Sequence, residues 1–124
     1  MPRYVILEHT GSASYKPGVH WDLMLEFGDR LRAWELPATP SAVVPMDVRQ
    51  LPDHRLEYLT LEGPLSGDRG HVRPWDRGGF DVVLEQPAKL VVTISGAELR
   101  GTLTFARSPA NEWRLEFVPD RATS

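Results

Sequence analysis

The sequence contains no cysteine, which excludes a disulfide framework and any metal site built on thiolates. A metal ion in this protein would therefore be held by histidine and carboxylate side chains. No apolar run approaches the roughly 20 residues that cross a bilayer, and the first residues do not resemble a secretory signal. We therefore expect a cytoplasmic protein that has no contact with a membrane.

An excess of positive charge is also lacking. The 14 lysines and arginines against 17 acidic residues give a formal net charge of -3, which argues against a basic protein that coats nucleic acid but leaves room for local positive patches. P-loop, G-x-S-x-G and zinc-finger spacings are missing as well. Since the composition of the 124 residues shows no break, we expect one domain over residues 1–124, with its core in 3–118 and a frayed tail at 119–124.

What the sequence does contain is a series of short stretches rich in β-forming residues, separated by glycine and proline. Residues 10–19 read as a loop between two adjacent strands, residues 37–52, with four prolines, as an extended connection, and residues 76–79 as a turn. No stretch predicts a helix. The pattern predicts an all-β fold, a compact antiparallel β-barrel of about eight to nine short strands. The predicted strands are residues 3–9, 20–27, 31–36, 55–63, 70–75, 80–85, 89–95, 99–107 and 112–117.

The stretch HWDLMLE, residues 20–26, reads as a strand with two different faces. Residues two apart share a face of a strand. One face carries only apolar side chains and is expected to join the core, where each large side chain contributes about 1.5 to 3 kcal/mol. The other face places an imidazole beside a carboxylate. The apolar face holds Trp21, Leu23, Leu25 and Phe27, and the polar face holds His20, Asp22, Met24 and Glu26.

His9, His20 and Asp22 form a candidate metal site, because the loop after His9 brings it to the strand that carries the other two. Two imidazoles and a carboxylate suit Mn²⁺, Fe²⁺ or Zn²⁺ and leave coordination positions for water or substrate. The alternative is structural: the histidines are satisfied by hydrogen bonds and Asp22 caps a turn.

Two further groups are candidates for phosphate chemistry. His54, four residues before Tyr58, suits an acid–base or phosphate-contacting role, although it also fits a turn-stabilising histidine with Tyr58 in the core. Arg69, His71, Arg73 and Arg77 concentrate positive charge that would attract a phosphate, or they form a solvated basic turn. The four tryptophans are most simply core residues.

The order of the motifs is more specific than any one of them. Glu8-His9, HWDLMLE (20–26), LRAWELP (31–37), DHRLEY (53–58), LEG (61–63) and WDRG (75–78) together resemble the 3′-phosphoesterase domain of bacterial DNA ligase D and its stand-alone relatives. The resemblance extends over about residues 3–118, almost the whole chain.

The resemblance implies a β-barrel with a surface groove and a manganese-dependent enzyme of DNA repair and non-homologous end joining. Such enzymes act on DNA or RNA-tipped DNA 3′ ends, removing a terminal ribonucleoside and then the 3′-phosphate, and they work with a DNA ligase or polymerase. Carried onto this chain, His9, His20 and Asp22 match the metal ligands, with His9 also catalytic. His54 and Tyr58 match a catalytic pair that contacts the phosphate.

The chain departs from the family pattern at several positions. Met24 stands where the family has an arginine, and it cannot make the charge-assisted contact that a guanidinium offers a phosphate. Pro52 replaces a frequent acidic residue, and the family's N-terminal arm has no counterpart before the first strand. Arg73 or Arg77 would then supply the missing positive charge. The departures leave two alternatives open: a module that binds DNA ends or a repair partner without turnover, and a phosphoesterase for small phosphorylated substrates.

Overall fold

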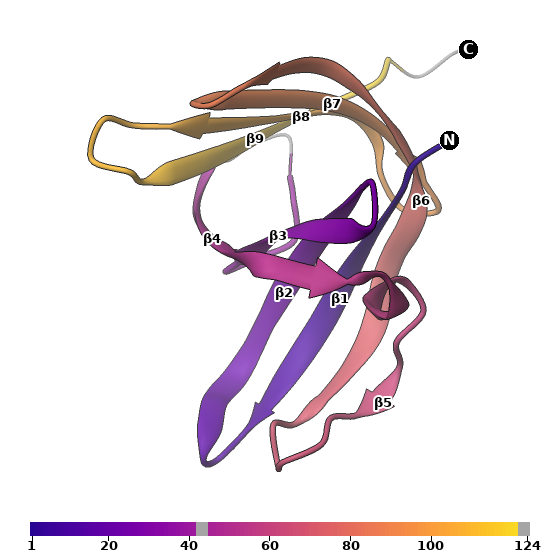
Figure 1. The fold of residues 1–124 in the computed structure, drawn as a ribbon, viewed down its shortest axis with the longest axis vertical. Coiled ribbons are helices and arrows are strands. Elements are labelled where there is room, and N and C mark those ends of the chain that lie inside the picture. The colour runs from indigo at the N-terminus through magenta and orange to yellow at the C-terminus, as the bar shows by residue number, and fades with distance from the viewer. Residues whose placement is uncertain (42–44, 122–124) are drawn as a thin grey trace.

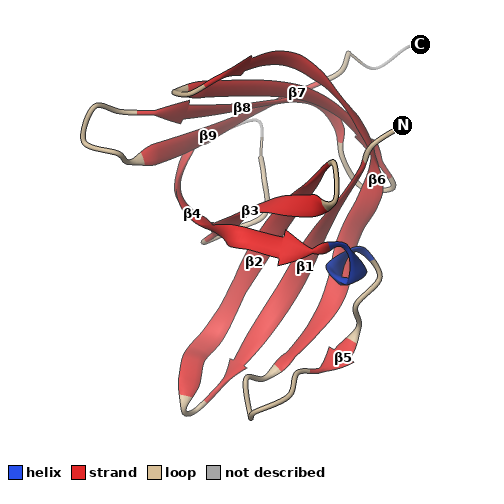
Figure 2. Cartoon of the chain, viewed as in Figure 1, coloured by secondary structure: helices blue, strands red, loops and turns tan. Residues whose placement is uncertain are grey.

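The computed structural model describes residues 1–41 and 45–121. Nine strands form one antiparallel sheet in the order β1-β2-β3-β4-β9-β8-β7-β6-β5, and pairing of β1 with β6 closes the sheet into a barrel-like ring (Figures 1 and 2). The described residues contain no α-helix and no helix long and apolar enough to cross a membrane. The predicted antiparallel all-β fold is confirmed. The elements are β1 (Arg3–Ser12), β2 (Tyr15–Phe27), β3 (Arg30–Leu36), β4 (Met46–Arg55), the 3₁₀ helix η1 (Leu56–Leu59), β5 (Gly63–Pro64), β6 (His71–Gln86), β7 (Lys89–Gly96), β8 (Arg100–Arg107) and β9 (Trp113–Pro119).

Strands β1, β2 and β3 are buried on both faces, because two hydrophobic clusters share them. The inner cluster fills the ring between these strands and β6–β9, and it includes Leu23, Leu25 and the fully buried Trp34. The outer cluster lies under η1 and the segment that follows it, and it includes Met24 and Leu59. The two faces predicted for residues 20–26 are confirmed: one face enters the inner cluster, and the other carries Met24 into the outer one.

The connection between His9 and His20 is a hairpin of two long strands rather than the predicted loop over residues 10–19. β1 continues to Ser12 and β2 begins at Tyr15, so that only Ala13 and Ser14 form the tip. A register shift between Thr10 and Ser12 absorbs the irregular sequence. The predicted placement of the two histidines on adjacent strands is confirmed, since His9 and His20 are directly paired.

The prediction for residues 37–63 was wrong in two places. Part of the expected connection is strand β4, which accommodates Pro52 at a register shift in its pairing with β3; residues 42–44 of that connection lie outside the described residues. The strand expected at 55–63 is instead the 3₁₀ turn η1. A strand would point Leu56 and Leu59 to opposite faces, whereas a 3₁₀ turn directs residues three apart to one side, and both pack with the outer cluster.

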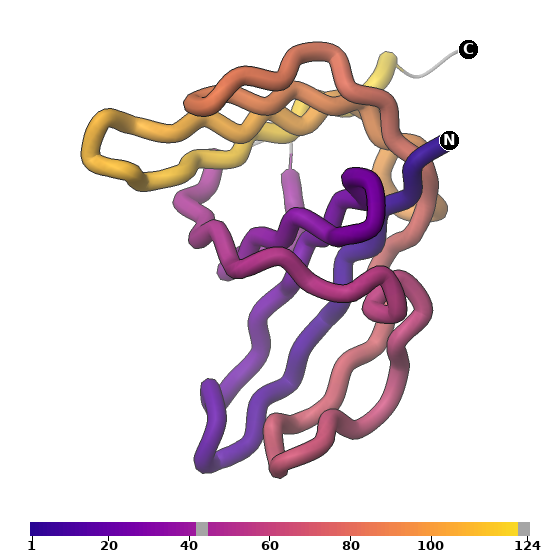
Figure 3. Tube along the Cα trace, viewed as in Figure 1, coloured from indigo at the N-terminus to yellow at the C-terminus, as the bar shows by residue number. Residues whose placement is uncertain are grey.

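The two strands predicted at 70–75 and 80–85 are one strand, β6, and the turn predicted at 76–79 lies inside it. Figure 3 shows this strand running from the lower end of the molecule into the upper layer. Its first half pairs with β1 and its second half with β7. At the crossing point a Cβ on Gly78 would lie 2.0 Å from the carbonyl oxygen of Ser95, so the glycine permits the close approach of β7 rather than a turn.

The C-terminal end of the ring is ordered further than the predicted tail allows. β9 includes Pro119, and the amide of Asp120 donates to the carbonyl of Arg100 at 2.9 Å. Backbone pairing with β8 therefore continues past Phe117, the last residue of the predicted strand. Residues 122–124 of the predicted tail lie outside the described residues.

Candidate metal centre

The candidate site lies on the outer face of the sheet, where the β1–β2 hairpin extends beyond the ring (Figure 1). Side chains alternate along a strand, so His9 on β1 and Asp22 on β2 point to the same side as the outer cluster. A cavity of about 70 Å³ opens there. Its lining consists of the three candidate ligands, the His54–Tyr58 pair, apolar residues of the outer cluster and three further side chains. These residues are His9, His20, Asp22, His54, Tyr58, Met24, Leu7, Leu51, Leu65, Val72, Tyr15, Lys16 and Arg69.

The structure brings the three predicted ligands together. His9 Nδ1 lies 3.1 Å from His20 Nε2 and 3.7 Å from Asp22 Oδ2, and His20 Nε2 lies 3.4 Å from Asp22 Oδ1. Atoms that each bind one ion at about 2.1 Å are separated from one another by about 3 to 3.5 Å. All three side chains offer a ligand atom within 4.8 Å of the others, so this group has the spacing of a metal site.

Asp22 supplies an independent test of the fit. It is buried, and its Oδ1 finds no hydrogen-bond partner within the described part of the chain. A buried carboxylate oxygen without a partner is costly. A divalent cation between Asp22 and the two imidazoles would satisfy this oxygen, so the residues present fit such an ion.

The orientation of His9 is fixed from the other side of its ring. His9 Nε2 donates to the carbonyl of Arg69 at 2.8 Å, which leaves Nδ1 of the neutral ring as a lone pair directed at His20 and Asp22. The loop approaches this closely because residue 70 is a glycine with φ of +83°. A Cβ at Gly70 would lie 1.9 Å from the carbonyl oxygen of Thr10.

The charges of the group support one another. Burial by itself would raise the pKa of Asp22, but contacts with His20 and His9 outweigh it and lower this pKa to about 2. The contact with Asp22 is also the main reason that the pKa of His9 is raised, against the opposing effect of burial. Asp22 is therefore ionised at neutral pH, as a metal ligand must be.

His54 and Tyr58 lie in the same cavity as the three candidate ligands. The His54 and Tyr58 rings meet edge to face, with centroids 5.0 Å apart. His54 Nδ1 donates to the carbonyl of Pro52 at 2.8 Å, which directs the other ring nitrogen away from the β4 backbone. The two segments predicted from sequence thus converge on one cavity.

Arg73 and Arg77 do not line this cavity. Arg73 pairs with Glu8 at 3.1 Å, and Glu8 is on the face of β1 opposite His9. Arg77 donates Nε to the carbonyl of Leu59 at 3.0 Å and so holds η1 against the sheet. The cationic side chains in the cavity lining are instead those of Lys16 and Arg69.

Glu35 is a site neighbour that the sequence reasoning missed. It lies opposite Asp22 in the β2–β3 pairing, and its Oε1 is 3.8 Å from His20 Nε2. Burial opposes the shift, but Lys16, Arg49 and His20 lower the pKa of Glu35. A signal was present in the sequence: a two-residue turn at Gly28-Asp29 pairs Phe27 with Arg30, and this register places Glu35 opposite Asp22.

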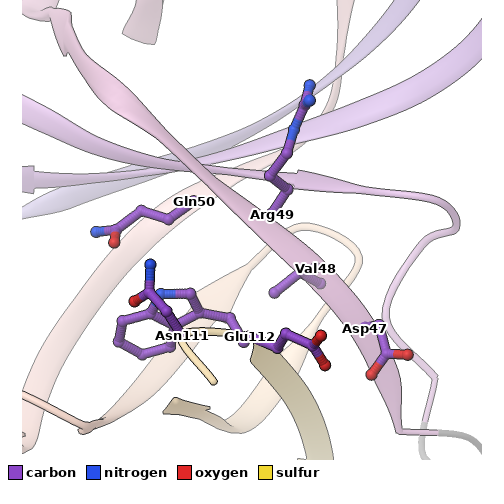
Figure 4. Close-up of a pocket in the computed structure, with 7 residues that line it drawn as sticks. Asp47, Val48, Arg49, Gln50, Asn111 and Glu112 are labelled. Atoms are coloured by element: carbon purple, nitrogen blue, oxygen red, sulfur yellow. The ribbon is translucent and has the colours of Figure 1, made fainter. Parts of the chain in front are cut away.

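A larger pocket of about 510 Å³ lies where β4 diverges from β9 (Figure 4). It is lined by Asp47, Val48, Arg49, Gln50, Asn111, Glu112 and Trp113. None of these residues belongs to the group that satisfies the metal-ligand spacing, so its size alone does not make it the candidate centre.

Two comparisons with known proteins bear on this site. The family described as the DNA ligase D 3′-phosphoesterase domain matches residues 8–107, a span that contains all three candidate ligands and the His54–Tyr58 pair. No curated protein matched the chain.

Proposed function

Because the chain belongs to the DNA ligase D 3′-phosphoesterase domain family, we propose that it is a metal-dependent hydrolase that heals DNA 3′ ends. The proposed substrates are a 3′-phosphate and a terminal 3′-ribonucleoside on a DNA primer strand. The product would be a 3′-hydroxyl for a DNA ligase or polymerase, in the cytoplasm of the cell. Membership of the family by itself supports a 3′-phosphoesterase-type function in DNA end repair.

The observation that carries the proposal is the Oδ1 of buried Asp22, which has no hydrogen-bond partner among the residues that the structure describes and lies beside two imidazoles. His9, His20 and Asp22 would hold the ion, which we propose to be Mn²⁺. When bound, a divalent cation there would neutralise charge on a phosphate and polarise a water molecule. The protein prepares for this by keeping Asp22 ionised and by directing His9 Nδ1 inward through the Arg69 carbonyl.

His54 is the proposed general acid. Its Nδ1 proton is held by the Pro52 carbonyl, so Nε2 is the nitrogen that would donate a proton to the leaving oxygen. The Tyr58 and His54 rings pack edge to face, and the Tyr58 hydroxyl is the proposed phosphate contact. Leu51 and Leu65 line the cavity together with His54 and Tyr58.

The first test is turnover of primer-templates that end in a 3′-phosphate or in a single 3′-ribonucleotide, with Mn²⁺ and with a chelator. We expect conversion with Mn²⁺ and none with the chelator. His20→Ala should reduce the rate by at least about a hundredfold, because it removes a metal ligand. His71→Ala is the matched control, since the fourth histidine of the chain is exposed and outside the cavity.

The proposal fails if wild-type protein shown to bind Mn²⁺ converts neither substrate, or if His20→Ala retains the activity of His71→Ala. One observation favours a second candidate for that case. Met24 is 1% exposed and lines the cavity without contributing charge, which is compatible with a module that binds DNA ends or a repair partner without turnover. Affinity for a 3′-phosphorylated end without hydrolysis would identify it.

A further inference from the structure

A row of paired residues runs across the outer face of the sheet beside the candidate centre. Asp22 on β2 is opposite Glu35 on β3, and Glu35 is opposite Arg49 on β4. Directly opposed residues in antiparallel strands have Cβ atoms about 5 Å apart. Glu35 therefore stands between the candidate metal centre and the cation of the next strand.

Glu35 holds two cations at once. Lys16, from the β1–β2 hairpin, donates Nζ to Glu35 Oε1 at 2.8 Å. Arg49 donates to both carboxylate oxygens at 3.1 Å, and Figure 4 shows its side chain extending away from Asn111 and Glu112. One carboxylate thus shares two positive charges, and the cluster keeps a net charge of about +1.

Of the two permanently charged cations in the cavity lining, Lys16 is the one that can change partner. The Arg69 guanidinium is engaged within its own loop, by the carbonyl of Ser66 at 2.7 Å and its hydroxyl at 3.1 Å. Lys16 has a flexible side chain that is 36% exposed. An ion pair at this level of exposure contributes about 1 kcal/mol or less, so an incoming dianion can displace Glu35 at little cost.

We propose that Lys16 is a phosphate-contacting residue that leaves Glu35 for the terminal phosphate of the substrate, while Arg49 stays on Glu35 and neutralises it. The proposal rests on the function proposed above. In the free protein Glu35 Oε1 contacts both Lys16 Nζ and, at 3.8 Å, His20 Nε2, so it holds the ammonium beside the candidate metal ligands. Without Arg49, the departure of Lys16 would leave an unpaired carboxylate facing the phosphate.

The chain offers a direct test, because Lys16 and Lys89 are its only lysines. The test measures acylation of the two ammonium groups by mass spectrometry, in Mn²⁺, with and without a primer-template ending in a 3′-methylenephosphonate, which cannot be hydrolysed. We expect several-fold protection of Lys16 and none of Lys89, which lies at the exposed start of β7. Equal labelling of Lys16 with and without the probe would overturn the proposal.

Two variants separate a phosphate contact from a structural role. Lys16→Met should raise KM for a 3′-phosphorylated end about tenfold, as expected for the loss of one charge-assisted hydrogen bond, and Lys89→Met should leave it unchanged. Glu35→Gln should lower KM, because the competing carboxylate is gone. If Lys16→Met behaves as Lys89→Met does, or if Glu35→Gln raises KM, the proposal is wrong. The protection assay needs no turnover, so it judges Lys16 separately from the proposed hydrolysis.

Discussion

The pKa values of Asp22 and His9 are shifted in opposite directions, and the sign of each shift defines the pH range in which that residue contributes to stability. Asp22 has a lowered pKa, so its contribution to stability is present above its ordinary value of 3.8 and is lost as the pH falls toward about 2. His9 has a raised pKa, so its contribution is present below its ordinary value of 6.5 and is lost as the pH rises through the higher value of the folded protein. The pair stabilises the metal-free protein most between these limits.

Binding of Mn²⁺ should have the opposite pH dependence on the alkaline side. The ion needs an unprotonated His9, and the raised pKa of His9 makes protons stronger competitors. We therefore expect metal affinity to rise with pH above 6.5 while the metal-free protein loses stability. Titration of Mn²⁺ and urea unfolding of the metal-free protein over about pH 5 to 8, about a unit and a half beyond the ordinary histidine pKa on each side, would show this crossing. Parallel trends would contradict it.

Asp76 is the second buried carboxylate whose surroundings define its role, and this role is structural. It accepts hydrogen bonds from the Tyr4 hydroxyl and from the amides of Arg77, Glu98 and Leu99. These bonds join β1, β6 and the β7–β8 turn at the place where β6 passes from pairing with β1 to pairing with β7. The hydrogen bond to Asp76 and burial together raise the pKa of Tyr4, with burial the larger effect.

Replacing Asp76 by alanine should therefore destabilise the protein by about 3 to 5 kcal/mol, because it leaves buried donors without an acceptor. Asp81→Ala is the matched control, since Asp81 is exposed on the same strand, and its effect should stay within about 0.5 kcal/mol. Urea unfolding measures both. Similar losses for the two variants would show that the hydrogen bonds of Asp76 are not what stabilises this corner.

At the scale of elements, the loop between β5 and β6 positions the site from outside the sheet. The amide of Leu65 donates to the carbonyl of Gly70 at 2.8 Å and closes the loop. The Ser14 hydroxyl, at the hairpin tip, donates to the Asp68 carboxylate at 3.0 Å. The loop thereby presents the Arg69 carbonyl to His9. Gly70 is its critical residue, because a Cβ there would enter the backbone of β1.

Gly70→Ala should cost about 3 kcal/mol and weaken Mn²⁺ binding at least about tenfold, because the Arg69 carbonyl would move away from His9. Gly67→Ala separates backbone strain from collision: Gly67 also has a positive φ, of +71°, but its Cβ would meet nothing closer than 4.0 Å. That variant should lose about 1 kcal/mol and keep its metal affinity. Calorimetric titration with Mn²⁺ compares the two. Equal affinities would mean that the carbonyl does not orient His9.

Elements with a clear alternating pattern were predictable, and those shaped by distant partners were not. Residues 20–27 and 31–36 alternate between two faces, residues 3–9 form a short run rich in β-forming side chains, and all three segments lie within strands. β4 was missed because the four prolines of residues 37–52 suggest a connection, whereas the strand contains only Pro52, at a shift in its pairing with β3. η1 was missed because alternation over so few residues fits a strand and a 3₁₀ turn equally well. Only the packing of its side chains on the outer cluster distinguishes the two.

At the scale of the whole molecule, the ring consists of two runs of strands joined by long-range pairings. β1–β4 and β6–β9 each follow the order of the chain, and the runs meet where β1 pairs with β6 and where β4 pairs with β9. The second join has only three residue pairs, from Met46 to Val48. The sequence predicted an antiparallel sheet of about eight to nine strands, but two of the predicted strands are halves of β6 and β4 was not among them. A single sequence carries no direct signal for either join.

The same limit explains which site residues were found. The candidate ligands lie on one predicted hairpin and were identified from local patterning. Arg69 and Lys16 reach the cavity through the loop before β6 and the hairpin tip, positions that depend on packing between segments. Arg73 and Arg77 were chosen by charge density. Strand register places Arg73 beside Glu8, on the face opposite His9, and the Leu59 carbonyl engages the Arg77 guanidinium.

Three strands serve two hydrophobic clusters, and this arrangement has a consequence for inheritance. Along β2, successive codons alternate between residues such as Leu23, which fill the ring, and residues such as Asp22, which face the candidate centre. A mutation in either codon threatens the abundance of the protein in the cell, because both faces are buried, and a mutation on the outer face can also change its chemistry. Selection that alters the candidate centre therefore has to preserve the outer packing, as the apolar side chain of Met24 does.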